Sequence, residues 1–511
     1  MKIAFRADAS LDIGTGHIMR CLTLANGLRK SGAICSFVSR DLPAHLGERI
    51  RAEGFSVTLL PPPDHKAPSP PPAHAAWAGV TWQQDALETR AAVGEGLDWL
   101  VLDHYAFDAR WQKAALPAKA RLMVIDDLAD RQHICALLLD QNLGRELSSY
   151  QSLVPPDCVQ LIGPKYALLR PEFAVVRADA LNARAKRSLR HLLINMGGVD
   201  AQDATSRVLM ALPGADLPEE TRITVIMGKH APALGNVRSL AVDMPWATEV
   251  LVNVSDMARH MADADLAIGA AGSTTWERCA LGLPSILVQI ADNQASIMRA
   301  MVDAEAALDP GPPDAPDFPV RLRAALSRAQ AQLEEISQNA ASICDGDGMS
   351  RVTALLTKPS PQFRRATIAD SRRVWEWRTA SDLERTSLSG QVPLFQDHHL
   401  WFTHALNDPQ RVFRVLSLGE WPCGYLRLDF NTQARARVST CISPDAQGKG
   451  LSAFLLAEAM RLAQHSGLSY LDAEIHATNA ASLRCFERAG YARRSSIGSF
   501  YTYELALEHH E

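Results

Sequence analysis

The sequence has few cysteines, and no two of them are spaced as a metal-binding or redox pair. Nine cysteines occur among 511 residues, an odd number, and none forms a C-x-x-C motif. This pattern argues against a zinc ribbon or a disulfide scaffold. It is typical of a protein that resides in a reducing cytoplasm. No apolar run approaches the ~18 residues that a membrane-spanning helix requires. The N-terminal MKIAFRADASLDIG lacks the apolar core of a signal peptide. We therefore expect a cytoplasmic protein with no membrane segment.

The sequence also lacks an excess of either charge. Lys and Arg number 52 and Asp and Glu 57, which gives a net charge of −5, whereas general nucleic-acid binders carry a basic excess. Hydrophobic residues make up 47% and charged residues 21%, values typical of folded globular chains. The length predicts about three to five domains. We expect a multidomain enzyme that does not bind nucleic acid, and the sequence does not indicate its oligomeric state.

Strand-like apolar runs alternate with helix-like periodic segments over the first two thirds of the chain. These runs lie at 2–7, 34–39, 56–60, 99–102, 121–125, 136–139, 191–196, 221–228, 264–270 and 284–289. The alternation predicts parallel sheets with crossover helices, in two Rossmann-like lobes at 1–185 and 186–356. A Pro-rich segment at 61–72 interrupts the first lobe. We interpret it as an exposed insertion without a role, with peptide docking as the alternative.

The pattern changes after a linker that we expect at 357–364, the stretch TKPSPQFR. Helix-like segments are followed by three strand-like runs, a Gly-rich turn, a helix, a strand and a last helix. They lie at 375–385, 398–406, 412–418, 423–430, 436–443, 452–463, 468–477 and 479–490. This order predicts an α+β domain over 365–511.

The first candidate site is the loop between the strand at 2–7 and the helix that starts near His17. Gly14 and Gly16 allow a ligand to approach the backbone, and the free amides of the helix start favour an anion. A histidine beside that positive helix end is disfavoured as imidazolium and can act as a base. The alternative is a capping turn with a histidine that only packs. Because the G-x-G-H motif and Asp8 share one loop, we favour the catalytic interpretation.

Two glycine-containing turns follow strands of the second lobe and are candidates for binding a diphosphate. They are Gly197-Gly198 and Gly272-Ser273-Thr274, the latter opening a helix. Glu277, in the first turn of that helix, can accept both hydroxyls of a ribose. From spacing alone, a capping box formed by Thr274 and Glu277 is an equal alternative. Asn293 follows a strand where such sheets commonly face a ligand.

Several separated segments resemble one family. They are RADASLDIGTGHIMRCLTLA, VLDHYAFDARW, VIDDLADRQHICALLLDQN, LIGPKYALLRPEF and GAAGSTTWERCALGLPSI. Together they resemble the UDP-sugar hydrolase of pseudaminic acid biosynthesis, which is similar to GT-B glycosyltransferases. The resemblance implies two lobes facing across a cleft, with diphosphate at Gly272–Thr274, ribose at Glu277 and the sugar toward Asp8 and His17. It implies that His17 is the general base for a water that displaces UDP with inversion, and it favours ribose binding by Glu277.

A further glycine-rich turn lies in the C-terminal domain. It joins the strand at 438–442 to the helix that starts at Ser452. Backbone amides of the turn Gln447-Gly448-Lys449-Gly450 can bind a pyrophosphate, although such connections are also common without a ligand. Asn479 precedes the last predicted helix and by itself is a good N-cap.

The segments ISPDAQGKGLSAFLLAEAM and IHATNAASLRCFERAGY are similar to GNAT-type N-acetyltransferases. The resemblance implies acetyl-CoA as co-substrate, with pantetheine along 440–442. The residues it implies for acetyl-CoA binding are Ile442, Gln447, Gly448, Lys449, Gly450, Ser452 and Asn479. Many relatives use a Tyr as general acid where this chain has Phe486, so that role would pass to Tyr491, another group or water. Glu474 is our candidate base, and His476 is the runner-up. The alternative interpretation is that Glu474 is an ordinary surface residue of its strand.

The combined resemblances predict a bifunctional enzyme of pseudaminic acid biosynthesis. The GNAT domain would acetylate the 4-amino group of a UDP-activated amino sugar, and the segment 378–387 resembles the acceptor side of that acetyltransferase. The first two lobes would then hydrolyse the product. The alternatives are a GT-B glycosyltransferase fused to an acetyltransferase for another acceptor, or a sugar-nucleotide-binding regulatory protein. No cluster has the spacing of metal ligands, and we expect no metal.

Overall fold

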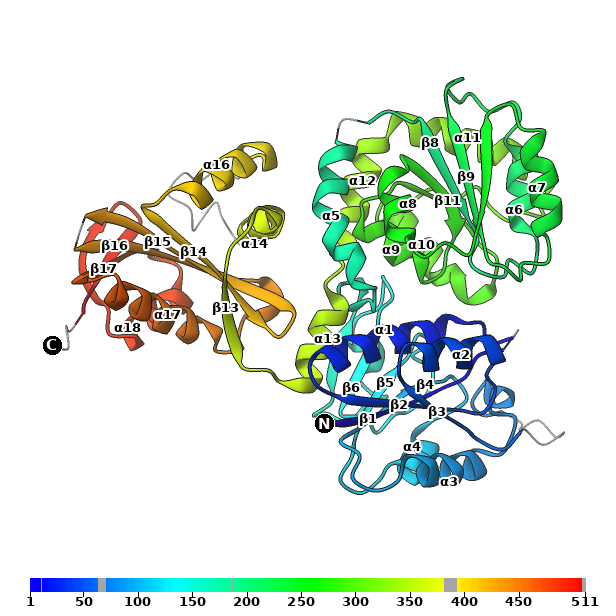
Figure 1. Cartoon of the computed structure of the whole chain (residues 1–511), viewed down its shortest axis with the longest axis horizontal. Coiled ribbons are helices and arrows are strands. Elements are labelled where there is room, and N and C mark those ends of the chain that lie inside the picture. The colour runs from blue at the N-terminus through cyan, green and yellow to red at the C-terminus, as the bar shows by residue number, and fades with distance from the viewer. Residues whose placement is uncertain (11, 63–69, 186, 381–392, 433, 508–511) are drawn as a thin grey trace. The chain divides into compact units, whose positions relative to one another are not determined.

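The computed structural model describes residues 1–511 except 11, 63–69, 186, 381–392, 433 and 508–511. It divides into two compact units, Met1–Thr353 and Ala354–Glu511. The first unit contains two parallel sheets and the second contains one mixed sheet (Figure 1). The predicted class, two α/β lobes followed by an α+β domain, is therefore confirmed.

The first lobe is a doubly wound sheet of seven parallel strands. Its strand order is β3-β2-β1-β4-β5-β6-β7. Its elements are β1 (Lys2–Ala7), α1 (Gly16–Lys30), β2 (Ile34–Ser39), α2 (Ala44–Ala52), β3 (Ser56–Leu59), η1 (Ala75–Ala78), α3 (Trp82–Val93), β4 (Trp99–Asp103), α4 (Ala109–Ala115), β5 (Arg121–Ile125), β6 (Leu137–Asp140), η2 (Leu147–Tyr150), β7 (Val159–Ile162) and η3 (Pro164–Tyr166). The order reverses between β1 and β4, so the loops that follow these two strands flank the crevice where such sheets bind ligands.

The second lobe repeats this design with five parallel strands in the order β10-β9-β8-β11-β12. Its elements are α5 (Pro171–Arg184), β8 (His191–Asn195), α6 (Ala204–Ala211), β9 (Arg222–Met227), α7 (Leu234–Val242), β10 (Ala247–Val252), α8 (Met257–Asp263), β11 (Leu266–Ala270), α9 (Thr274–Ala280), β12 (Ser285–Val288), η4 (Asp292–Gln294), α10 (Ala295–Asp303), α11 (Phe318–Ala331) and α12 (Leu333–Ile343), and α13 (Gly348–Thr357) follows them in the chain. Here the order reverses between β8 and β11. The structure adds β10, for which no strand was expected.

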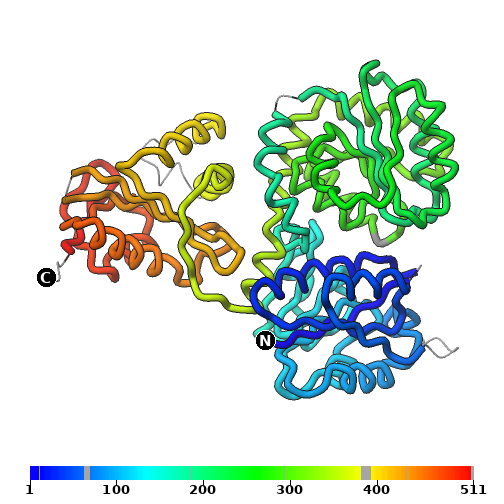
Figure 2. Tube along the Cα trace, viewed as in Figure 1, coloured from blue at the N-terminus to red at the C-terminus, as the bar shows by residue number. Residues whose placement is uncertain are grey.

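The first lobe is not a continuous stretch of sequence, and the second lobe begins earlier in the chain than expected. Phe173 and Ala180 of α5 belong to the same buried cluster as β11 and α9, so α5 packs on the second lobe although it precedes the boundary expected at 185. Conversely, α13 returns to the first lobe, where a Cβ on Gly27 of α1 would lie 2.2 Å from the Met349 sulfur (Figure 2). A boundary at one position in the sequence therefore cannot separate the lobes.

The second unit has a seven-stranded sheet in the order β13-β14-β15-β16-β17-β19-β18. Its elements are β13 (Pro361–Arg365), η5 (Ile368–Asp370), α14 (Ser371–Thr379), α16 (Phe395–Asn407), β14 (Arg411–Leu418), β15 (Trp421–Thr432), β16 (Arg435–Ile442), η6 (Pro444–Ala446), α17 (Leu451–His465), β17 (Tyr470–His476), α18 (Ala480–Arg488), β18 (Ala492–Ile497) and β19 (Phe500–Ala506). The linker expected at 357–364 is shorter, because 361–365 pair with β14. The C-terminal hairpin of β18 and β19 was not expected.

The sheet of the second unit opens between two neighbouring parallel strands. β16 pairs with β17 only over 435–437 and 470–472, although β16 continues to Ile442 and β17 to His476. Leucines and alanines of α17 pack on one face of the sheet. Trp377 of α14 and Phe402 of α16 pack on the other face, against Tyr425. The gap in pairing lies between these two layers of helices.

Candidate active sites

The ligand-binding loops predicted from sequence lie at the reversal points of the first two sheets. His17 follows β1, and Gly197-Gly198 and Gly272-Ser273-Thr274 follow β8 and β11. The carboxyl edges of the two sheets also approach each other. The ring of His45, after β2, lies 5.4 Å from that of His230, after β9, measured between centroids. Both predicted loop sets therefore lie at the carboxyl edges of these two sheets.

His17 is held by a carboxylate that sequence reasoning did not single out. Its Nδ1 atom lies 2.6 Å from Oδ1 of Asp103, the last residue of β4. The Arg20 guanidinium donates to both oxygens of Asp103, each over 2.6 Å. Burial raises the pKa of Asp103, but the charges of Arg20 and His17 outweigh it and hold that pKa well below its usual range. Because an ionised carboxylate only accepts, Nδ1 carries the proton, and the lone pair of the neutral ring is then on Nε2.

Arg20 is itself fixed by groups from a third strand end. Its Nη1 atom lies 2.7 Å from Oδ2 of Asp127, which follows β5. The Tyr105 hydroxyl donates to the same carboxylate. The network therefore joins His17 to residues after β4 and β5. The sequence did contain a signal for Asp103, because it is the charged residue that ends the otherwise apolar run WLVLD.

Asp8 is held within a buried polar network. Its carboxylate is fully buried and pairs with Arg6 over 2.6 Å. It also accepts from the Arg40 amide over 2.7 Å and lies 3.1 Å from Nε2 of His104. Burial raises the pKa of Asp8, and Arg6 and His104 outweigh that effect and lower it. Asp8 is thus part of the buried framework beneath the loops, and direct sugar binding by Asp8 stays a prediction.

The flanking residues Gly14 and Gly16 leave the loop before His17 open. Gly14 has a φ of +79°, and a Cβ on either glycine would meet no atom of the described chain within 4 Å. Gly16 is the first residue of α1. The backbone here is therefore accessible, as anion binding at a helix start requires.

In the second lobe, two glycines hold neighbouring loops in contact. A Cβ on Gly228, after β9, would lie 1.9 Å from the carbonyl oxygen of Gly198. Gly197 has a φ of +94°, a conformation that favours glycine. The Gly197-Gly198 loop is thus positioned by the close approach of Gly228, a residue that the sequence did not mark as important.

The turn at Gly272 leads directly into the start of α9. Ser273 is the N-cap of α9, and among the described residues its first turn receives no side-chain cap. Thr274 lies inside α9 and accepts from Arg278, and because Ser273 is the N-cap, Thr274 and Glu277 do not form the alternative capping box. A Cβ on Gly272 would lie 3.7 Å from Nε2 of Gln294. The side chain of Asn293 lies outside what the structure describes.

Glu277 is a largely buried carboxyl with one distant partner. Its side chain is 17% exposed and lies 3.8 Å from the Arg170 guanidinium. Burial raises the pKa of Glu277 to about 7, and Arg170 and Arg278 act against that rise. A carboxyl with unfilled acceptor capacity suits the hydroxyl pair for which the sequence proposed it.

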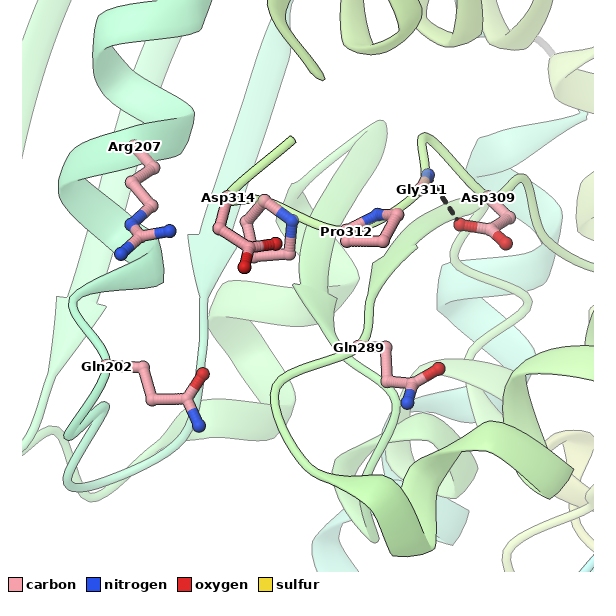
Figure 3. A pocket seen from close by; sticks show the side chains of 8 residues that line it. Gln202, Arg207, Gln289, Asp309, Gly311, Pro312 and Asp314 are labelled. Carbon is pink, nitrogen blue, oxygen red and sulfur yellow. Dashed lines mark hydrogen bonds between the residues drawn. The ribbon is translucent and has the colours of Figure 1, made fainter. Parts of the chain in front are cut away.

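A cavity of about 410 Å³ lies on the second lobe beside these loops. The side chains of Arg207 and Asp314 point into the same space, above Gln202 and Gln289 (Figure 3). The Gly311 amide donates to Asp309 at its rim over 2.7 Å. None of the residues predicted for the site lines this cavity in the described structure, so it is separate from the proposed UDP position.

The opening between β16 and β17 forms a cavity of about 690 Å³. Most residues that the resemblance assigns to acetyl-CoA line it, namely Ile442, Gln447, Gly448, Gly450, Ser452 and Asn479, whereas Lys449 is exposed outside it. Gly448 and Gly450 have φ values of +75° and +72°, so this turn needs glycine. Asn479 is also the expected N-cap, since its side chain accepts from the Ser482 amide over 3.1 Å.

Both candidate bases of the acetyltransferase line this cavity. Ala473 and Ile475 of β17 belong to the core beneath α17, so Glu474 and His476 point to the opposite face of the sheet. Glu474 lies 3.5 Å from Arg437 of β16, across the opening.

The two aromatic candidates for proton donation are arranged differently. Phe486 lines the cavity, whereas Tyr491 is not among its lining residues and packs against the Phe486 ring in the core. The structure therefore does not support Tyr491 as the proton donor. Tyr425 lines the cavity instead, and burial raises its pKa to about 12. Of the acceptor segment at 378–387, Arg378 lines the cavity and 381–387 lie outside the described residues.

Two further absences concern the described residues only. No three or more His, Cys, Asp or Glu side chains among them are arranged to hold a metal ion. Asp126 accepts from the amides of Leu128 and Ala129, so it closes the end of β5. Among the described helices, none has the length and apolar character needed to cross a membrane.

Comparison with known proteins assigns both units. The spore coat polysaccharide biosynthesis protein SpsG of Bacillus subtilis is 24% identical over 359 residues, 70% of this chain and 98% of that protein. UDP-2,4-diacetamido-2,4,6-trideoxy-beta-L-altropyranose hydrolase of Campylobacter jejuni is 27% identical over 243 residues, 47% of this chain and 74% of that protein. The crystal structure of MurG from Acinetobacter baumannii shares the fold, with a TM-score of 0.53 at 17% identity, over 70% of this chain and 99% of that one.

The C-terminal comparison involves the other unit. Residues 373–491 match the profile of the acetyltransferase (GNAT) family, and this range includes the opened strands and the Gly448–Gly450 turn. The chain therefore joins a region with a GT-B fold, similar in sequence to UDP-2,4-diacetamido-2,4,6-trideoxy-beta-L-altropyranose hydrolase, to a C-terminal domain that matches the acetyltransferase (GNAT) family.

Proposed function

We propose that the chain catalyses two consecutive reactions of pseudaminic acid biosynthesis. The GNAT domain transfers an acetyl group from acetyl-CoA to the 4-amino group of UDP-4-amino-4,6-dideoxy-N-acetyl-β-L-altrosamine. The GT-B region hydrolyses the resulting UDP-2,4-diacetamido-2,4,6-trideoxy-β-L-altropyranose to UDP and the free sugar. The observation that carries this proposal is the pairing of His17 with Asp103 at the point where the strand order of the first sheet reverses. The relatives of this region include a hydrolase of that nucleotide sugar.

In the hydrolysis step, His17 Nε2 takes a proton from water as the water oxygen attacks the anomeric carbon. The bond between that carbon and the UDP oxygen breaks, UDP leaves, and the configuration inverts. Asp103 keeps the proton on Nδ1 and stabilises the imidazolium that forms. Amides at Gly272–Thr274 bind the diphosphate and Glu277 binds the ribose.

In the acetylation step, acetyl-CoA lies in the opening between β16 and β17, with its pyrophosphate at Gln447–Ser452. Glu474 takes a proton from the attacking amine, the new C–N bond forms and the thioester C–S bond breaks. Because Phe486 cannot donate a proton, the CoA thiolate is protonated by another group or by water.

One assay tests the order of the two reactions. The full chain receives the UDP-4-amino sugar with and without acetyl-CoA, and CoA and UDP are measured separately. We expect UDP release only when acetyl-CoA is present, without any acceptor alcohol. CoA release without UDP, or neither product, would refute the proposal. UDP release that requires an added acceptor would instead identify a glycosyltransferase.

Two variants assign the products to their sites. His17→Gln should abolish UDP release and leave CoA release intact, because the acetyltransferase site lies in the other unit. Glu474→Gln should slow CoA release and leave hydrolysis of the acetylated nucleotide unchanged. If His17→Gln released UDP at the wild-type rate, the assignment of the general base would be wrong.

A further inference from the structure

The segment that follows the Pro-rich insertion places aromatic rings beside His17. The Trp77 and Tyr105 rings are stacked with centroids 5.6 Å apart, and His74 lies 4.5 Å from Trp77. The His17 ring packs edge-on against Tyr105 at 4.7 Å, with Trp77 at 6.5 Å. The part of this segment that the structure describes therefore contributes two rings to the surroundings of the proposed base.

These two rings are held in place by their own element. Ala75 and Ala78 of η1 are buried, with 6% and 3% of their surface exposed. The preceding chain is tied to α4, because Arg110 donates to the Pro71 carbonyl over 3.1 Å. His74 and Trp77 themselves are half-buried, which leaves ring surface available beside His17. This combination of a fixed backbone and partly open rings is typical of a preformed binding surface.

The chemistry of the wall indicates which part of a substrate it contacts. Diphosphate and ribose are assigned to the second lobe, so the sugar is the part of a UDP-sugar that reaches His17. Aromatic faces bind apolar surface, and a pyranose offers such surface in its C–H groups and in a methyl at carbon 6. A hydroxyl buried against the rings would lose its hydrogen bonds to water.

We propose that His74 and Trp77 form a specificity wall that selects sugars with a methyl group, rather than a hydroxymethyl group, at carbon 6. The wall packs against that methyl and the adjacent ring face and so places the anomeric carbon beside His17. The inference rests on the proposed hydrolase function and deepens it by naming the sugar subsite. It also gives a role to the segment that directly follows the Pro-rich insertion at 61–72.

The test uses two probes that differ only at carbon 6, UDP-N-acetylglucosamine and its 6-deoxy analogue. Their Kd values and that of UDP are measured by calorimetry on the full chain, so that the result does not depend on turnover. We expect wild type to prefer the 6-deoxy probe by about 10- to 100-fold, the range over which apolar pockets discriminate against an added hydroxyl. The double variant His74→Ala/Trp77→Ala should lose this preference and keep the UDP Kd, whereas Trp77→Phe should retain most of it.

Trp82→Ala is the matched control. Trp82 packs beneath the Arg110 guanidinium at 5.6 Å and, within the described chain, makes no ring contact with His17. This variant should keep the 6-deoxy preference. The wall is refuted if the double variant keeps the wild-type preference. It is also refuted if the double variant loses UDP affinity and Tm to the same extent, because the rings would then only support the fold. A wild type that discriminates between the probes but hydrolyses no UDP-sugar would overturn the proposed function and leave the wall intact.

Discussion

The Nδ1 atom of His17 lies 2.6 Å from the Oδ1 atom of Asp103, although 86 residues separate the two in the chain. The contact exists because β1 and β4 are neighbours at the point where the strand order of the first lobe reverses. Arg20 then ties Asp103 to Asp127, so the imidazole is oriented by groups from three strand ends. A base held this firmly loses little freedom when a substrate binds.

Replacing Asp103 by Asn tests whether this contact sets the tautomer of His17. The amide can donate to Nδ1 and so favour the proton on Nε2, which removes the lone pair that water needs. We expect kcat for UDP release to fall by about 10²- to 10⁴-fold, with little change in KM. The exposed Asp98→Asn should retain wild-type kcat. An unchanged kcat in Asp103→Asn would show that Asp103 does not act through His17.

Gly228→Ala tests the loop at Gly197-Gly198 without altering it directly. The new Cβ would lie 1.9 Å from the Gly198 carbonyl oxygen, so that loop must shift. We expect the Kd of UDP to rise by about 10- to 100-fold, the order of loss expected for a misplacement near 1 Å. Calorimetric titration with UDP measures the effect.

The matched control for that variant is Gly235→Ala, in α7. A Cβ there meets no atom of the described chain within 4 Å, and Ala is the better helix former by about 1 kcal/mol. Gly235→Ala should therefore bind UDP normally and be slightly more stable. Equal UDP affinity in both glycine variants would remove the Gly197-Gly198 loop from the site.

Glu277 should make the stability of the first unit depend on pH. Burial raises its pKa from 4.5 to about 7 in the folded chain, so between these values the folded state holds a proton that the unfolded state releases. Stability from this group therefore falls as pH rises from 4.5 to 7, by about 3 kcal/mol in total. Glu277→Gln does not titrate and should gain in Tm over wild type as the pH increases.

Thermal unfolding of both proteins at about pH 5 and about pH 8 measures the difference in Tm between them. These two pH values enclose most of the range over which Glu277 should titrate. The exposed Glu219→Gln controls for the substitution itself. A constant difference in Tm between wild type and Glu277→Gln across the range would contradict the raised pKa. A difference in Tm that shrinks with rising pH would show that folding lowers the pKa of Glu277 instead of raising it.

Comparison of Glu474→Gln with His476→Gln distinguishes the two candidate bases of the acetyltransferase. We expect Glu474→Gln to lower the rate of CoA release by about 10²-fold, with the KM for acetyl-CoA unchanged, because Gln cannot accept the proton from the amine. Glu487→Gln is the control, since Glu487 accepts from the Tyr503 hydroxyl and is not among the residues lining the cavity. A larger loss in His476→Gln would transfer the role to His476.

Most strands that the sequence did not reveal lie at sheet edges, whereas β19 of the unexpected C-terminal hairpin lies between β17 and β18. β18, with the sequence ARRSSI, is exposed throughout, and β10 and β13 are edge strands with alternating exposure. An edge strand needs no continuous apolar run, because its pairing is decided by the neighbouring strand. The buried strands, such as β4 and β11, were apparent because every one of their residues is buried.

By itself the sequence determined the features that depend on neighbouring residues. These include the buried strands, the glycine turns with positive φ at Gly448 and Gly450, and the order of elements that defines the GT-B lobes and the GNAT domain. The tertiary structure alone decided which distant side chains meet. It paired Asp103 with His17, buried Asp8 within the framework and set Trp77 beside the proposed base. Such contacts follow from strand order and register, which bring together side chains that local periodicity does not relate.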